Sequence, residues 1–129
     1  MTDVLVVDDD PVARETLEAV LRKAGYNVFV AANAFEAFME LRVRPVHVVV
    51  SDVRMPYVEG TNFYHQLSEE FPALAERVVF VTGSSDPRAV ATETGRLCLS
   101  KPLDPEAVLR TVKAIADRRA PIQEGGPNP

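Results

Sequence analysis

The chain has 129 residues, with 14 basic and 19 acidic side chains, a formal net charge of −5, and 47% hydrophobic residues. This length suits one domain with a real core, because domains most often have about 100–150 residues. The acidic balance argues against direct binding to nucleic acid, which relies on a basic surface, and the single cysteine, Cys98, excludes an internal disulfide and a cysteine-rich zinc site. No apolar run approaches the roughly 20 residues that span a bilayer, so we expect a cytoplasmic protein without membrane insertion.

Short apolar runs, mostly of β-branched residues, alternate with helical patterns along the chain. The runs predict strands that are covered on both faces, at Val4–Val7, Val28–Val30, Val46–Val50, Val78–Val81 and Leu97–Leu99. Apolar stripes at helical spacing lie between and after them, at Leu17–Ala24, Ala34–Leu41, Phe63–Phe71 and Val108–Ile115. The segment Asp86–Thr94 is only weakly periodic, so we expect a short helix there. This alternation predicts an α/β fold with a parallel sheet.

Several residues mark where the helices begin and end. An aspartate that can cap a helix precedes a proline that can open it in three places, Asp10-Pro11, Asp86-Pro87 and Asp104-Pro105. Asn33 and Glu36 have the spacing of a capping box, and Gly25 suits the end of the first helix. We expect Pro72 to close the helix that contains Phe63.

The predicted strands end in polar residues. Asp8, Asp9 and Asp10 follow the first strand, and the third, fourth and fifth strands end in Asp52, Thr82 and Lys101. Ligands of open α/β sheets bind at this carboxyl edge. Two carboxylates 4 Å apart repel by about 4 kcal/mol at an effective dielectric constant of 20, so such a cluster calls for a cation, and oxygen ligands suit Mg²⁺. A central carboxylate there can act as a nucleophile and form an aspartyl phosphate, with the metal and the lysine stabilising the transition state.

Each of these residues alone has a simpler explanation. Asp10 is most simply a helix cap, and Lys101 alone would be a solvated loop lysine. The combination of acids, a hydroxyl and a lysine at the ends of different strands is what indicates a phosphoryl-transfer site.

The stretches VLVVDDDPV, VVVSDVRMPYVEG, VVFVTG and LSKPL resemble the receiver domain of bacterial response regulators. The resemblance covers residues 3–119. It implies a single-domain flavodoxin-like (βα)5 sandwich, whose five-stranded parallel sheet has the order 2-1-3-4-5. We therefore expect a receiver domain at residues 1–119 and a flexible tail or the start of a linker, rich in proline and glycine, at residues 120–129.

The resemblance also implies roles for the residues at the strand ends. Asp52 matches the aspartate that accepts a phosphoryl group from phosphohistidine. Asp8 and Asp9 match the acidic pair that binds Mg²⁺, together with Asp52 and the backbone carbonyl of Arg54.

Further positions match the family's pattern around the phosphoryl group. Thr82 matches the switch hydroxyl that moves toward it, and Lys101 matches the lysine that pairs with it. The Lys101–Pro102 peptide is often cis in relatives, and Gly83 matches a small residue that keeps the pocket open. Met55, Pro56 and Gly60 match the loop after the acceptor, and Arg54 and Ser84 stand where relatives tune dephosphorylation.

The chain departs from the family pattern at three places. Cys98 stands where an aromatic switch residue is usual, and we expect it to be a buried apolar side chain rather than a redox sensor. Leu103 replaces a customary phenylalanine, and the interval from Thr82 to Lys101 is a few residues shorter than in the receiver domains of typical transcription factors. The sequence around Lys101 resembles that of receiver domains attached to hybrid histidine kinases.

The function implied is that of a receiver in two-component signalling. A histidine kinase or histidine phosphotransfer protein would donate the phosphoryl group, docking near Val12, Arg14 and Leu103, and the change would switch contacts with an unknown downstream protein. The chain would not be an enzyme in the usual sense, although it would catalyse its own phosphorylation and dephosphorylation. We expect His47 not to be catalytic, and His65 to lie on the surface.

Three alternatives stay open. The chain could be a phosphorylation-independent interaction module, or the receiver fragment of a hybrid histidine kinase. Asp8-x-Asp10 also superficially fits a haloacid dehalogenase motif, in which Asp8 would be the nucleophile of a Mg²⁺-dependent phosphohydrolase.

Overall fold

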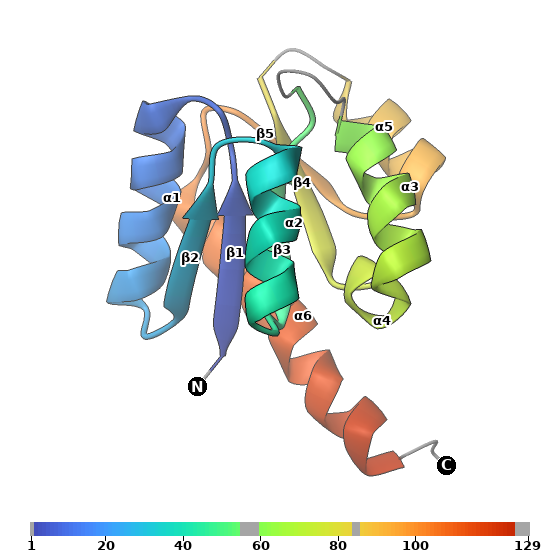
Figure 1. The fold of residues 1–129 in the computed structure, drawn as a ribbon. Helices are drawn as coiled ribbons and strands as arrows, with labels where there is room; N and C mark the ends of the chain where they lie inside the picture. Colours follow the sequence, from blue (N-terminus) through green and yellow to red (C-terminus); the bar gives the residue numbers. More distant parts are fainter. Residues whose placement is uncertain (1, 55–59, 84–85, 126–129) are drawn as a thin grey trace.

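Five parallel strands form one sheet in the order β2-β1-β3-β4-β5, as predicted. The computed structural model describes residues 2–54, 60–83 and 86–125, with the backbone only for 60–61 and 119–125. The strands are β1 (Asp3–Val7), β2 (Asn27–Ala31), β3 (Val48–Asp52), β4 (Val78–Thr82) and β5 (Cys98–Ser100). The helices are α1 (Pro11–Lys23), α2 (Ala34–Val43), α3 (Gly60–Glu70), α4 (Pro72–Ala75), α5 (Pro87–Thr94) and α6 (Pro105–Gly125). The helices cover both faces of the sheet (Figure 1).

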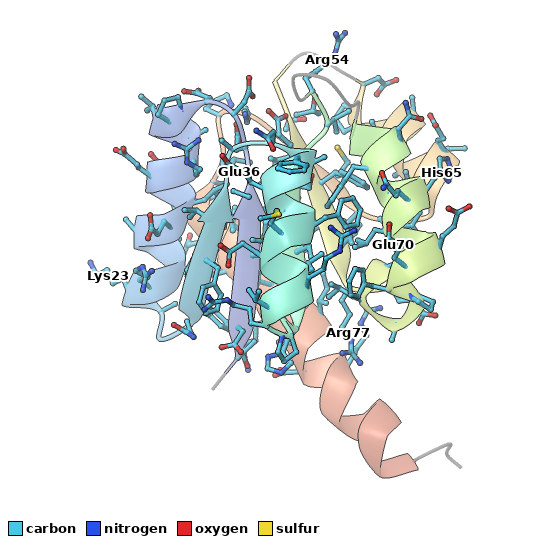
Figure 2. All side chains as sticks on the ribbon, viewed as in Figure 1. Lys23, Glu36, Arg54, His65, Glu70 and Arg77 are labelled. Carbon is cyan, nitrogen blue, oxygen red and sulfur yellow. The ribbon has the colours of Figure 1, made fainter. Side chains whose placement is uncertain are left out.

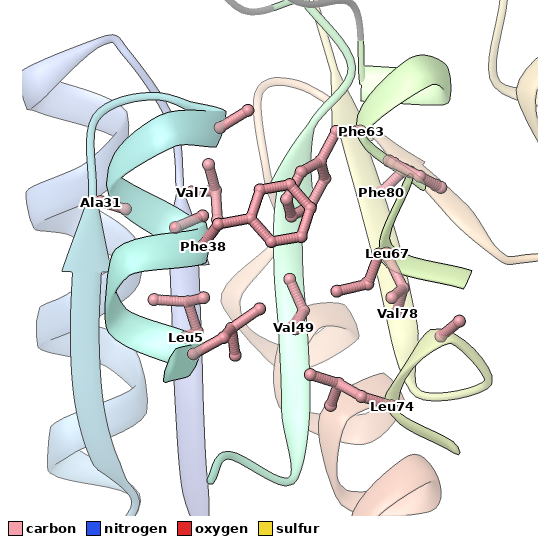
Figure 3. Packing of buried hydrophobic residues seen from close by; sticks show 14 of the residues in the cluster. Leu5, Val7, Ala31, Phe38, Val49, Phe63, Leu67, Leu74, Val78 and Phe80 are labelled. Carbon is pink, nitrogen blue, oxygen red and sulfur yellow. The ribbon is translucent and has the colours of Figure 1, made fainter. Parts of the chain in front are cut away.

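Successive strand residues supply two separate hydrophobic cores, one on each side of the sheet. On the α2 side, Leu5, Val49 and Phe80 pack with residues of α2, α3, α4 and α5, and Figure 3 shows Phe38 and Phe63 meeting there. On the α1 side, Val4 and Val50 pack with residues of α1 and α6. Because side chains alternate along a strand, each strand residue belongs to one side only. The fully covered sheet explains the continuous apolar runs in the sequence.

The predicted helix caps are confirmed. The side chains of Asp10, Asp86 and Asp104 each accept a hydrogen bond from the backbone N–H two residues later, at 3.1, 3.0 and 3.1 Å. Asn33 caps α2 by accepting from the Glu36 N–H at 2.8 Å, and the Glu36 carboxylate accepts from the Ala32 N–H at 2.8 Å. These bonds satisfy donors that a helix start leaves unpaired, so the connections that lead from the sheet into the helices are fixed by the sequence.

Several element boundaries differ from the prediction, most of them by one residue. Pro72 does not simply close α3 but opens the separate one-turn helix α4, because a proline is well suited to a first helical position. β3 begins at Val48, two residues later than expected. His47 just before it bonds to Asp3 in both directions: its N–H donates to the Asp3 carbonyl at 2.8 Å, and its Nδ1 accepts from the Asp3 N–H at 2.9 Å.

Residues 120–129, which we expect to be a flexible tail or the start of a linker, begin inside α6. Helix α6 extends to Gly125, so residues 120–125 are helical, and residues 126–129 lie outside the described part of the chain. Pro121 removes one backbone donor from the helix, which is a single local cost of about 3 kcal/mol, and the preceding Arg-Arg-Ala residues favour helix. Within the described ranges, no helix is both long and apolar enough to cross a membrane.

Candidate phospho-acceptor site

The polar residues singled out in the sequence meet at the carboxyl edge of the sheet. Asp8 follows β1, Asp52 ends β3, Thr82 ends β4 and Lys101 follows β5. The strand register brings them level, since Asp52 pairs with Val81 across β3 and β4. The strand order explains the convergence, because β1 and β4 are the two neighbours of β3.

Asp8 is completely buried and is held from several directions. Its Oδ1 accepts from the Asp10 N–H at 3.0 Å, and its Oδ2 accepts from Lys101 Nζ at 3.0 Å. Its carbonyl accepts from Arg14 Nη1 at 2.9 Å, and its N–H donates to the Ala31 carbonyl at 3.1 Å. The position of this carboxylate is therefore set by β2, α1 and the segment after β5 together.

Asp52 is the central carboxylate of the site and is only 5% exposed. Its Oδ1 accepts from the Arg54 N–H at 3.3 Å, and its Oδ2 lies 3.7 Å from Lys101 Nζ. Burial and the negative charge of Asp8 raise the pKa of Asp52 to about 6, against the lowering effects of Lys101 and the Arg54 N–H. The ionised form of Asp52 is therefore destabilised until something positive approaches it.

The third carboxylate, Asp9, is exposed at the rim of the site. One oxygen from each of Asp8, Asp9 and Asp52 lies within 4.8 Å of the others. Three carboxylate oxygens from two strand ends are the hard ligands that Mg²⁺ takes, and a bound cation would offset the repulsion that raises the Asp52 pKa. The residues present fit a divalent cation.

Lys101 is the cation of the site, and its side chain is 23% exposed. Burial lowers the pKa of Lys101, but the hydrogen bond to Asp8 and the charges of Asp52 and Asp8 outweigh this effect, so its pKa is raised and the ammonium stays charged. Its backbone N–H donates to the Thr82 carbonyl at 2.7 Å, and the Lys101–Pro102 peptide is cis, as expected. A Cβ built on Gly83 would lie 3.6 Å from Lys101 Cδ, an ordinary contact, so a larger side chain there would meet the lysine stem.

Thr82 lies close to these residues, as do Cys98 and Leu103, at which the chain departs from the family pattern. Thr82 is buried, at 2% exposure, and Cys98 is half-buried against the α2-side core rather than fully buried. Burial, with the charges of Asp52 and Asp86, raises the pKa of the Cys98 thiol to about 11, so little reactive thiolate forms at neutral pH. Leu103 packs against the α1-side core.

Of the remaining positions predicted from the sequence, one is confirmed and three lie outside the described residues. His65 is exposed, as predicted, and Figure 2 shows it on α3. Met55, Pro56 and Ser84 lie outside the described residues.

Sequence reasoning missed one contact of the site. Arg14 was singled out for docking, yet its guanidinium is bonded to the Asp8 carbonyl and is half-buried. The only signal in the sequence is its place one turn into α1, from which a long side chain can reach back toward the helix start.

Comparisons with known proteins agree with this geometry. Residues 4–113 match the family described as the response regulator receiver domain. The chain is 35% identical to the response regulator Rre1 of Synechocystis over 127 residues, covering 95% of this chain and 55% of that protein. It is 36% identical to the transcriptional regulatory protein AruR of Pseudomonas aeruginosa, covering 89% of this chain and 49% of that protein. The chain thus spans about half the length of these curated relatives.

Solved structures give the same fold. A CheY-like receiver domain protein from Methanospirillum hungatei superposes with a TM-score of 0.84 at 24% identity, covering 93% of this chain and 97% of that one. The chemotaxis protein CheY4 of Vibrio cholerae superposes with a TM-score of 0.79 at 28% identity, covering 89% of this chain and 98% of that one.

Proposed function

Because the chain belongs to the response regulator receiver family, we propose that Asp52 accepts a phosphoryl group from a phosphohistidine in a Mg²⁺-dependent reaction. The chain is then a phospho-acceptor module of two-component signalling rather than a conventional enzyme, and it works with a histidine kinase. The observation that carries the proposal is the meeting of Asp52 with two further carboxylates and one lysine at a single edge of the sheet.

The reaction uses Asp52 as the nucleophile. A carboxylate oxygen of Asp52 bonds to phosphorus while the bond from phosphorus to the histidine nitrogen breaks, and the electron pair stays on the imidazole. This step needs the ionised carboxylate, and a pKa of about 6 leaves Asp52 largely ionised at neutral pH. Burial of Asp52 would also keep bulk water away from the acyl phosphate. The chain would catalyse both the attachment and the loss of the phosphoryl group.

The metal would be held by Asp8, Asp9, Asp52 and the backbone carbonyl of Arg54. When bound, Mg²⁺ supplies positive charge to the phosphoryl oxygens. Asp8 is already fixed by four hydrogen bonds, so little ordering is needed before binding.

Lys101 and Thr82 complete the proposal. Lys101 would pair with a phosphoryl oxygen, exchanging its contact with Asp52 at 3.7 Å for one with the new group. Thr82 would move its hydroxyl toward the phosphoryl group and report phosphorylation to the neighbouring elements. Cys98 cannot act as the aromatic partner of this switch, so we propose that the response is carried by Thr82 and the backbone bond from Lys101 to its carbonyl.

The donor protein would dock beside the start of α1. Val12 is 72% exposed there, two residues after the Asp10 cap, and Leu103 lies two residues after Lys101 on the same edge of the sheet. Arg14 is held by Asp8, so we propose that it orients the site rather than reaching the donor.

The test is phosphorylation by acetyl phosphate with and without Mg²⁺. We expect the wild type to be labelled only with Mg²⁺, the Asp52→Asn variant to lose the label, and the Asp86→Asn variant to keep it, since Asp86 is an exposed helix cap that asparagine can replace. A label that persists in Asp52→Asn overturns the proposal. A label on Asp8 would instead favour the phosphohydrolase, in which Asp8 is the nucleophile.

Cys98 gives one reason to keep the phosphorylation-independent module as a second candidate, because the usual aromatic switch residue is missing. Equal partner binding by the unphosphorylated wild type, the phosphorylated wild type and Asp52→Asn would favour that candidate.

A further inference from the structure

A hollow lies at the opposite end of the sheet from Asp52. It has a volume of about 480 Å³ and opens between the end of α2 and the segment from Phe71 to Arg77. Its apolar walls include Leu41, Val43, Pro45, Val46, Phe71 and Leu74. Small-molecule sites are typically apolar concave cavities of about 300–1,000 Å³, so the size and the lining suit a small ligand.

The hollow is separate from the phospho-acceptor site. Val46 lies just before β3, and Asp52 ends that strand, six residues later. At about 3.3 Å per residue, this places the two sites about 20 Å apart. Figure 2 shows the same separation, with Arg54 at one end of the molecule and Arg77 at the other.

Every charged residue that lines the hollow is an arginine, although the chain as a whole has a net charge of −5. Arg42 lies 3.5 Å from Glu70, and Arg44 pairs with Glu40 at 3.2 Å and stacks over the Phe29 ring at 4.2 Å. These two arginines therefore have partners, and they lie near the C-terminus of α2, whose partial negative charge they offset.

Arg77 differs from the other two. Its side chain is half-buried, and among the described residues no hydrogen bond or ion pair reaches its guanidinium. A half-buried cation without a counter-ion has lost part of its hydration without compensation. A guanidinium presents forked N–H donors that match a carboxylate or a phosphate.

We propose that this hollow binds a small amphipathic anion, with an apolar body against the α2 and Phe71–Leu74 walls and a carboxylate or phosphate head against Arg77. The site is distinct from the acceptor site and does not rest on the function proposed for Asp52.

Titration with decyl phosphate, decanoate and decyltrimethylammonium, each below its micelle concentration and followed by amide NMR, tests the proposal. We expect both anions to shift the amides of residues 41–46 and 71–77, and the cation with the same tail to bind at least about tenfold more weakly, equivalent to 1.4 kcal/mol. Comparison of the two anions tells whether the head preferred is a carboxylate or a phosphate. Equal binding of the cation, or shifts outside these segments, overturns the proposal.

Variants then separate the charge from the walls. Arg77→Gln should weaken binding of both anions by about tenfold, whereas Arg77→Lys should keep part of it and Arg88→Gln, on α5 and outside the hollow, should leave it unchanged. Ala73→Phe, which fills the hollow from α4, should abolish binding of anion and cation alike. Asp52→Asn should bind the probes as the wild type does, so a failure of the acceptor proposal would not be confused with a failure here. Unchanged anion affinity in a folded Arg77→Gln variant overturns the proposal.

Discussion

The two ends of the sheet use polar groups in opposite ways. At the carboxyl end, Asp8 and Asp52 are buried close together, and burial, with the negative charge of Asp8, raises the pKa of Asp52 to about 6. At the amino end, each polar group of Asp3 meets a neutral partner: Asn27 Nδ2 donates to its carboxylate at 3.0 Å, and His47 Nδ1 accepts from its N–H at 2.9 Å. The contrast teaches that the unfavourable burial of like charges lies where a bound cation could relieve it. At the other end, hydrogen bonds to neutral side chains join the strands.

The largest effect should come from removing the only cation among the described residues that bonds directly to the buried carboxylates. We expect Lys101→Met to lower the free energy of unfolding by about 2–3 kcal/mol at pH 8, because Asp8 loses its partner and Asp52 its neighbouring charge. Urea unfolding measures this. The matched control is Lys113→Met: Lys113 also pairs with an aspartate at 3.0 Å, but its side chain is 70% exposed, so stability should hardly change. Similar losses in the two variants would remove the contrast between buried and exposed pairs.

The second effect has the opposite sign. Asp52→Asn should raise the free energy of unfolding by about 1–3 kcal/mol above pH 6 without divalent cations, because it removes a carboxylate that is costly to ionise. The folded-state pKa is raised, so the wild type loses stability as pH rises from 3.8 to about 6, and the advantage of the variant should appear over that window and vanish below it. Thermal unfolding from pH 4 to 8, with Asp86→Asn as the control, checks this. A gain that does not depend on pH would contradict it.

The third effect concerns the cation. Mg²⁺ at ten times its dissociation constant should stabilise the wild type by about 1.4 kcal/mol through binding to the folded state alone. Asp52→Asn should gain clearly less, since one of the three carboxylates is then neutral. Differential scanning calorimetry at matched ionic strength, with NaCl in place of MgCl₂, measures the difference. Equal stabilisation of both proteins would place the cation elsewhere.

The smallest effect belongs to the amino end. His47→Phe should cost about 1 kcal/mol, because the Asp3 N–H loses its acceptor, and labelling of Asp52 by acetyl phosphate should stay unchanged. His65→Phe, on the exposed surface of α3, is the control and should be near neutral. A loss of labelling in a folded His47→Phe variant would show that the two ends are coupled.

The sheet and most of the candidate site could be predicted from the sequence, because they depend on the periodicity of apolar residues and on the order of the segments along the chain. Alternating apolar segments define parallel strands, and parallel strands bring Asp8, Asp52, Thr82 and Lys101 to one edge whatever the details of the loops. Capping residues such as Asp10 act on neighbours two or three positions away, so they too could be read directly.

The features that the sequence did not reveal depend on packing between distant segments. The bond from Arg14 to the Asp8 carbonyl depends on where a long side chain turns back. The hollow beside Arg77 depends on how α4 sits against the end of α2, and Pro72 alone does not distinguish a helix end from the start of another.

Because the two cores lie on opposite faces of the sheet, the strand ends at the candidate site connect to both of them. Asp8, Asp52 and Lys101 continue the positions of Val6, Val50 and Leu99, which contact the α1-side core, whereas Thr82 continues the position of Phe80, which contacts the α2-side core. By this alternation, Asp52 shares the face of Val50, whereas Thr82 shares the face of Phe80. If Asp52 is phosphorylated as proposed, movement of Thr82 toward the phosphoryl group would act on the α2-side core through the end of β4.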